Sequence, residues 1–206
     1  MTGGARKWLL LPLLAAAGAL LLTGIDLATR TRVGENIQHE RERVLLDTLS
    51  LPLATRASLE ADGISNNSAL LGLRAPEHIY LARIDGRVAA VIVPVVARDG
   101  FHGDIELLVA VSRNGHVDNV RVVRHNETAG IGDAIEPEKS PWLRQFLGKS
   151  LSNPTGEQWR LKNDGGQFDQ ITGATITSRA VTHALHNALQ YVADHRAELL
   201  RDKTHD

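Results

Sequence analysis

The chain contains no cysteine in its 206 residues. This absence excludes disulfide bonds, cysteine-ligated zinc, iron–sulfur clusters, attached c-type haem and thiol nucleophiles. Aromatic residues are also scarce, with three Trp, two Tyr and three Phe. The net charge of −1 provides no basic surface field, so nucleic acid is not an expected partner.

One long apolar run lies near the N-terminus. No charged residue occurs from Trp8 to Ile25, and at about 1.5 Å per residue such a helix spans roughly 27 Å, close to the bilayer's hydrocarbon core of about 30 Å. A cleaved signal peptide is the alternative, but the run is long for one and no small-residue cleavage site follows it. We therefore predict a cytoplasmic N-terminus at 1–7, a transmembrane anchor at 8–28 in contact with membrane lipid, and an exported domain at 53–206.

Between the anchor and the domain, the sequence predicts a helical stalk at 29–52. From Val33 to Leu51 the apolar residues recur at helical spacing with charged residues between them. Pro52 is expected to end this helix. The segment from Ala54 to Pro76 contains many turn-forming residues and no strong pattern, so we predict irregular structure there.

The central third of the chain predicts an antiparallel sheet. Asp85-Gly86 and Asn114-Gly115 separate β-branched runs, and such dipeptides favour hairpins because the turn residues adopt positive φ. Pro94 indicates an edge strand or a bulge, because proline cannot donate a ladder hydrogen bond. The expected strands are 78–84, 87–96, 105–111 and 117–123.

The last third predicts helices and loops. We expect a short helix from Trp142 to Leu147, a short strand from Trp159 to Leu161, and a helix from Arg179 to about Arg201. The expected buried stripe of the last helix is Val181, Ala184, Leu185, Ala188, Leu189 and Val192. The predicted fold class is α+β: an antiparallel sheet core with a C-terminal helix, preceded by one transmembrane helix and a helical stalk.

A hydroxyl-rich segment, Asp169 to Ser178, directly precedes this helix. A turn that brings backbone amides to a helix N-terminus attracts anions, phosphate above all, because unpaired N–H groups and the helix dipole point the same way. Alternatively, Thr175, Thr177 or Ser178 caps the first turn and does nothing else. Both interpretations stay open on physical grounds alone.

The same segment resembles a known motif. Thr172-Gly173-Ala174-Thr175, with Asp169 six residues before the last threonine, is similar to the flavinylation motif of the FMN-binding domain family. Three further segments resemble the G subunits of Rnf (Rsx) electron transport complexes: Gly100 to Gly103, His125 to Asp133, and Asp164 to Asp169. With the anchor included, the resemblance covers nearly the whole chain. One departure is the stretch from Glu127 to Gly132, which has Ala and Ile where the family commonly has Pro and Leu.

The resemblance implies that FMN is covalently bound to the Thr175 hydroxyl through a phosphoester bond. A separate magnesium-dependent flavin transferase, with FAD as donor, would make this bond. Asp169 would either act on the threonine during transfer or be recognised by the transferase. Gly173 would allow the backbone to approach the phosphate closely. The cofactor-binding set implied in this segment is Asp169, Thr172, Gly173, Ala174, Thr175, Thr177 and Ser178.

A second loop, with Glu127, Thr128 and Gly130, is implied to lie beside the flavin. The chain would then be an electron-transfer flavoprotein subunit rather than a stand-alone enzyme. Its partners would be the other subunits of an ion-translocating complex in the bacterial inner membrane, with the soluble domain in the periplasm. The alternative is an anchored non-redox sensor or assembly module. His183 and His186 are three residues apart, but no third ligand accompanies them, so no metal site is predicted.

Overall fold

The computed structural model describes residues 44–66 and 69–201. The predicted anchor at 8–28 and most of the predicted stalk lie outside these residues. Within the two described ranges, no helix is both long enough and apolar enough to cross a bilayer.

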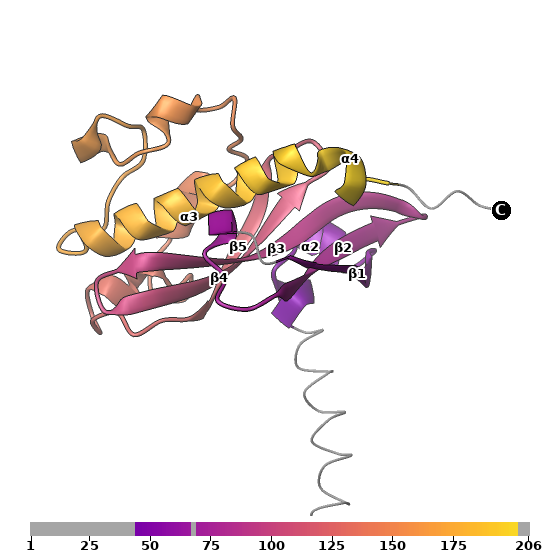
Figure 1. The fold of residues 1–206 in the computed structure, drawn as a ribbon. Coiled ribbons are helices and arrows are strands. Elements are labelled where there is room, and N and C mark those ends of the chain that lie inside the picture. The colour runs from indigo at the N-terminus through magenta and orange to yellow at the C-terminus, as the bar shows by residue number, and fades with distance from the viewer. Residues whose placement is uncertain (1–43, 67–68, 202–206) are drawn as a thin grey trace, which may run out of the picture. The chain divides into compact units, whose positions relative to one another are not determined.

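A five-stranded antiparallel sheet with the order β1-β2-β3-β4-β5 forms the centre of the domain (Figure 1). Four of these strands coincide with the predicted runs, which confirms an α+β fold with a sheet core. At the first predicted turn both Asp85 and Gly86 have positive φ, 50° and 77°, whereas at the second only Gly115 does. The strands are β1 Ser58–Asn66, β2 Glu77–Ile84, β3 Arg87–Gly100, β4 Gly103–Ser112 and β5 Val117–Arg124.

Two predictions about strands were wrong. The segment 54–76 is not irregular, because it contains β1, which pairs with β2 at the edge of the sheet. Its polar composition and Asp-Gly dipeptide conceal the strand, and the pairing shifts at that dipeptide. Pro94 marks neither an edge strand nor a bulge, because β3 is central and its register shifts lie elsewhere. The pairing of β3 with β2 ends at Ile92, however, so Pro94 pairs only with β4 and its missing N–H is tolerated.

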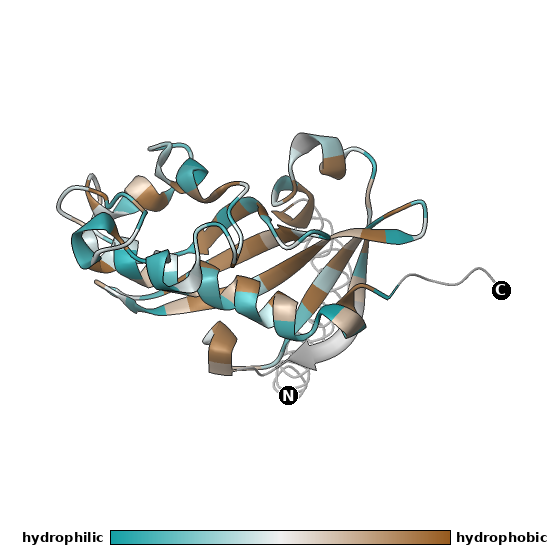
Figure 2. Cartoon of the chain, turned by 90° about the horizontal axis from the view of Figure 1, so that it is seen from above, coloured by the Kyte–Doolittle hydropathy of each residue, from teal (hydrophilic) through white to brown (hydrophobic). Residues whose placement is uncertain are grey.

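Helix α3, Thr175–Asp194, packs across one face of the sheet, followed by α4, Arg196–Leu199. All six residues of its predicted stripe are buried against the strands. Figure 2 shows the largely apolar strands beneath a helix that carries both apolar and polar residues. The helix starts at Thr175, earlier than the predicted Arg179.

The opposite face of the sheet is also covered. Residues 44–47 are helical, and α2, Leu51–Ala54, follows. Leu45 and Leu49 pack there against the strand residues Ala82, Ala90, Ile92, Leu108 and Ala110. Because both faces of β3 and β4 are buried, these strands are apolar almost throughout instead of alternating. Pro52 lies in the first turn of α2, where proline is tolerated, and does not end the preceding helix.

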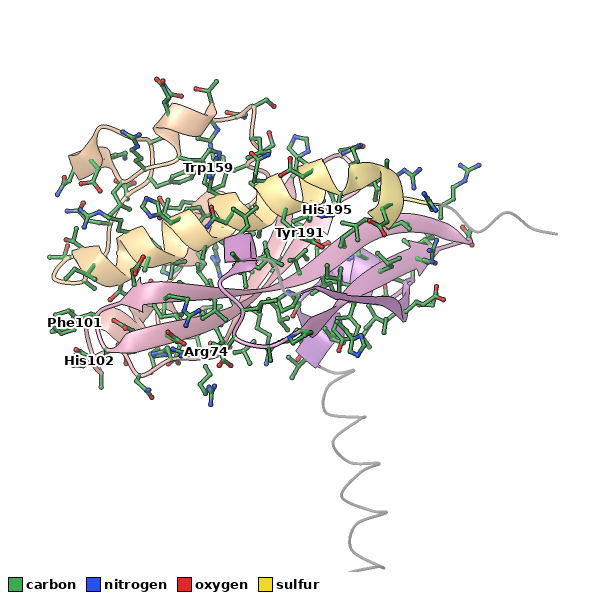
Figure 3. All side chains as sticks on the ribbon, viewed as in Figure 1. Arg74, Phe101, His102, Trp159, Tyr191 and His195 are labelled. Atoms are coloured by element: carbon green, nitrogen blue, oxygen red, sulfur yellow. The ribbon has the colours of Figure 1, made fainter. Side chains whose placement is uncertain are left out.

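The remaining connections are short 3-10 helices: η1 Ala69–Leu71, η2 Gly132–Ile135, η3 Trp142–Phe146, η4 Gly156–Gln158 and η5 Lys162–Asp164. The predicted helix at 142–147 is therefore a 3-10 helix. The predicted strand at 159–161 was wrong, because only Leu161 forms a bridge, an isolated one with Phe168. The Trp159 ring instead packs in a cluster with the rings of Phe146 and Phe168. Trp159 also contacts His186 of α3, so the helix lies between the sheet and this loop layer (Figure 3).

Candidate functional site

A pocket of about 430 Å³ lies at the start of α3. Its walls come from three parts of the chain that are distant in sequence: the turn between β3 and β4, the loop after β5, and the first turn of α3. Figure 3 shows Phe101 and His102 at the tip of the β3–β4 hairpin, at the end where α3 begins. The lining residues are Phe101, Glu127, Thr128, Ile131, Gly132, Gly173, Ala174, Thr175, Ile176 and Thr177. The fold therefore brings three of the motif-bearing segments together.

A tight turn places Thr175 at the helix start. The Ala174 amide donates to the Ile171 carbonyl at 3.0 Å, and Gly173 within this turn has φ of 81°. A residue with a Cβ is strained at that angle, so glycine suits the position. Ser178 fixes the turn from the helix side, because its hydroxyl accepts from the Ile171 amide at 3.0 Å and donates to the Ala174 carbonyl at 2.8 Å.

The first turn of α3 has no side-chain cap. The N-cap residue is Ala174, whose methyl group accepts no hydrogen bond. Of the three hydroxyls that could have capped the helix, Ser178 is used in the turn and Thr177 donates to Glu127. Among the contacts of the described residues, the half-buried Thr175 hydroxyl has no hydrogen-bond partner. The Thr175 hydroxyl is thus available next to first-turn amides that donate no hydrogen bond to any described side chain.

Glu127 connects the three walls of the pocket. Its side chain is buried, with 7% of the residue exposed. Oε1 accepts from the His102 amide at 3.0 Å, and Oε2 accepts from the Thr177 hydroxyl. One carboxylate therefore joins the loop after β5 to both the β3–β4 turn and α3.

The loop after β5 closes tightly against this carboxylate. The Thr128 carbonyl accepts from the amides of Ile131, Gly132 and Asp133. A Cβ on Gly132 would lie 2.9 Å from the Glu127 Cβ, so only glycine fits without displacement. Gly130, with φ of 77°, lies in the same loop but does not line the pocket.

Four predicted site residues lie outside the pocket lining: Gly130, Asp169, Thr172 and Ser178. The Asp169 carboxylate is largely exposed and contacts Lys162 Nζ at 2.7 Å. Its backbone is held by η3, because its carbonyl accepts from Trp142 Nε1 at 2.6 Å and from Gln145 Nε2 at 3.0 Å. The structure therefore does not bring Asp169 into the wall that contains Thr175.

The rim of the pocket is apolar. Phe101, Ile131 and Ile176 are 59%, 45% and 47% exposed, and all three line the pocket. Exposed large apolar residues gathered around one cavity indicate a binding surface. Sequence reasoning did not select these side chains, because exposed residues on turns follow no periodic pattern.

Ion pairs of Lys139 link two carboxylates that follow the loop after β5. Lys139 Nζ contacts Asp133 Oδ2 and Glu136 Oε1, both at 2.9 Å. The Lys139 ammonium lowers the pKa of Asp133, together with a backbone hydrogen bond from Gly130. Lys139 likewise lowers the pKa of Glu136, with a smaller contribution from His125. The two carboxylates in turn raise the pKa of Lys139.

No set of three acidic, His or Cys side chains able to hold a metal ion occurs in the part of the chain that the structure describes. The His186 ring, which lies one helical turn from His183 in α3, packs against the Trp159 ring. Burial lowers the pKa of His186.

Known proteins similar to this chain agree on one family. A family profile described as an FMN-binding domain matches residues 100–190, which include all three pocket segments. The G subunit of the ion-translocating oxidoreductase complex of Pseudomonas aeruginosa (strain UCBPP-PA14) is 44% identical over 195 residues, 95% of this chain and 91% of the relative. Its counterpart in Vibrio cholerae serotype O1 (strain ATCC 39541) is 38% identical over 91% of each chain. That of Shewanella baltica (strain OS223) is 36% identical over 90% of each.

Proposed function

The chain belongs to the family of G subunits of ion-translocating oxidoreductase complexes, and on that premise we propose that it is a membrane-anchored flavoprotein subunit that carries FMN covalently on Thr175. It relays electrons within the complex. The observation that carries this proposal is the Thr175 hydroxyl, which lines the pocket without a hydrogen-bond partner among the described residues.

The residues of the pocket fit this cofactor. A volume of about 430 Å³ lies within the usual range for small-molecule sites, about 300–1,000 Å³. The uncapped amides at the start of α3 suit a phosphate group. The exposed side chains of Phe101, Ile131 and Ile176 suit a flat aromatic ring. FMN, when bound, supplies the capacity to accept and release one or two electrons.

The protein's own residues then have defined tasks. The Thr175 oxygen would form the phosphoester bond to the FMN half of the donor FAD while the pyrophosphate bond breaks, AMP leaves and the hydroxyl proton is released. The neighbouring amides would offset the phosphate charge. Gly173 and Ala174 keep the approach to this oxygen uncrowded. Ser178 and Thr177 hold the first turn of the helix in place through their hydrogen bonds.

The proposed function also requires partner proteins and a membrane location. Since the chain has no cysteine, it offers no iron–sulfur or c-type haem relay of its own. Other subunits of the complex must therefore deliver and remove electrons. A flavin transferase is required for maturation, with Asp169 as an exposed recognition residue. We propose an anchor at 8–28 in the bacterial inner membrane, a stalk at 29–52 whose last residues pack on the sheet, and a periplasmic domain.

The alternative of a non-redox module requires Thr175 to be only a helix cap. In the structure the N-cap position belongs to Ala174, and no side chain caps this end. The capping interpretation therefore has no contact to support it.

Attachment is tested by co-expressing the full-length chain with a flavin transferase and viewing a denaturing gel under ultraviolet light. We expect a fluorescent band for the wild type and none for Thr175→Ala. Thr155→Ala, at an exposed threonine away from the pocket, is the control and should remain fluorescent. A fluorescent Thr175→Ala band would overturn the site assignment. For topology, a reporter fused after Asp206 that is active only in the cytoplasm would contradict the periplasmic placement.

A further inference from the structure

Glu127 is the only ionisable side chain among the described residues that line the pocket. Both of its carboxylate oxygens accept hydrogen bonds, Oε1 from the His102 amide and Oε2 from the Thr177 hydroxyl. An ionised carboxylate only accepts hydrogen bonds, so two donors match this charged form. The pocket wall therefore holds a negative charge.

This carboxylate has no ion-pair partner among the residues that the structure describes, 44–66 and 69–201. The nearby His125 ring accepts the Glu127 amide at Nδ1, 3.1 Å away, and contacts Glu136 Oε1 through Nε2 at 2.8 Å. A neutral ring with its proton on Nε2 satisfies both contacts, so the hydrogen bonding of His125 requires no positive charge.

The carboxylate is also fixed in position. A Cβ on Gly100 would lie 2.9 Å from Glu127 Oε1, and one on Gly132 would lie 2.9 Å from the Glu127 Cβ. The backbone therefore closes on this side chain from two segments. Together with the two hydrogen bonds, this packing prevents the carboxylate from turning away from the pocket.

We infer that Glu127 lowers the redox potential of the flavin held at Thr175, an inference that rests on the proposed function. Reduction adds electrons to the flavin, and a fixed negative charge in the same pocket disfavours added negative charge. Low exposure preserves this effect, because buried charges are screened by salt far less than exposed ones. The carboxylate thus keeps the flavin a stronger reductant than a neutral side chain would.

The test is a spectroelectrochemical titration of the full-length, flavin-loaded protein. We expect Glu127→Gln to raise the midpoint potential. A shift of about tenfold in the ratio of reduced to oxidised flavin at fixed potential corresponds to about 30 mV for a two-electron couple. The substitution preserves the local contacts, because the amide oxygen can accept from the His102 amide and the NH₂ can donate to the Thr177 hydroxyl.

The matched control is Asp194→Asn, which changes the net charge equally at the far end of α3. At about 1.5 Å per residue it lies roughly 28 Å along the helix from Thr175, so the potential should stay at the wild-type value. Thr177→Val is a second variant, because it removes one donor and leaves the carboxylate. At pH 8.5 we expect its potential to be more negative than that of the wild type.

The outcomes separate the two claims. A flavin-loaded Glu127→Gln protein with the wild-type potential overturns the inference and leaves the proposed function intact. If Glu127→Gln does not fold, Thr177→Val decides, and an unchanged or raised potential overturns the inference. Absence of flavin from the wild type after co-expression contradicts the proposed function, and the inference falls with it.

Discussion

The side-chain amide of Gln145 pairs with the backbone of Asp169 as a neighbouring strand would. Gln145 Oε1 accepts from the Asp169 amide at 2.7 Å, and Nε2 donates to the Asp169 carbonyl at 3.0 Å. Neither residue lines the pocket. This pairing fixes the backbone of the motif aspartate while its carboxylate remains exposed to a partner.

Loss of this pairing should slow flavin attachment. Gln145→Ala removes both hydrogen bonds, so the backbone of Asp169 becomes less ordered, at a cost of about 1 kcal/mol in folding free energy. We expect flavin transfer to slow severalfold in a time course with purified transferase, FAD and magnesium. Gln190→Ala, which removes only a contact with Asp194, should react at the wild-type rate. Equal rates for both variants would show that the order of Asp169 does not matter for transfer.

The apolar rim should shield the bound flavin from solvent. Phe101→Ala removes the most exposed of its three side chains, so iodide should quench the flavin fluorescence more strongly. Folding free energy should change by less than about 0.5 kcal/mol, because the residue is largely exposed. Leu147→Ala, an exposed apolar residue outside the pocket lining, is the control. Unchanged quenching in Phe101→Ala would place the flavin ring elsewhere.

Gly132 should be intolerant of a side chain. Gly132→Ala places a Cβ 2.9 Å from the Glu127 Cβ, and we expect a loss of about 1–3 kcal/mol in the free energy of unfolding. In Gly156→Ala the new Cβ has its nearest neighbour at 3.9 Å, so the change should stay below about 1 kcal/mol. Urea denaturation of the two variants compares these costs. Equal stability would mean that the loop moves freely away from Glu127.

The ion pairs behind the loop predict a pH dependence. Lys139 holds the pKa values of Asp133 and Glu136 below their usual range. Carboxylates of this kind stabilise the fold above their unfolded pKa of about 4, and the contribution is lost as the pH falls through the lower folded value. Lys139→Gln should therefore lower Tm by a few degrees at most at pH 7, and this difference should shrink below about pH 4.

Two controls accompany the thermal scans. Lys149, which forms no ion pair among the described residues, should tolerate Lys149→Gln without this pH-dependent difference. High salt should weaken the effect of Lys139→Gln, because the ammonium is about half exposed. A difference that persists undiminished at acid pH would exclude the two carboxylates as its source.

Local chemistry explains which parts of the fold were predictable. Asp85-Gly86 locates a hairpin because few other dipeptides adopt that turn. The apolar spacing from Val181 to Val192 identifies the buried face of α3, because a helix repeats about every 3.6 residues and a short stretch of sequence already shows the pattern. β1 was missed because an edge strand with a polar sequence has neither signal.

The site was predictable only in part, for a related reason. The motif selected Thr175 and Gly173, whose roles depend on adjacent residues. The contacts of Glu127 with His102 and Thr177 connect positions 25 and 50 residues apart, and no local pattern encodes them. The two hydrogen bonds between Gln145 and Asp169 were not predicted either, because η3 and the motif come into contact only in the folded chain.

The convergence of three distant segments on one pocket has a consequence for the order of events in maturation. Residue 101, the loop at 127–132 and the turn at 173–177 share a wall only after the sheet and α3 have assembled. A transferase that needs this complete surface would ignore a nascent or misfolded chain. Flavin attachment would then follow folding, and the covalent bond would mark the copies that had folded correctly.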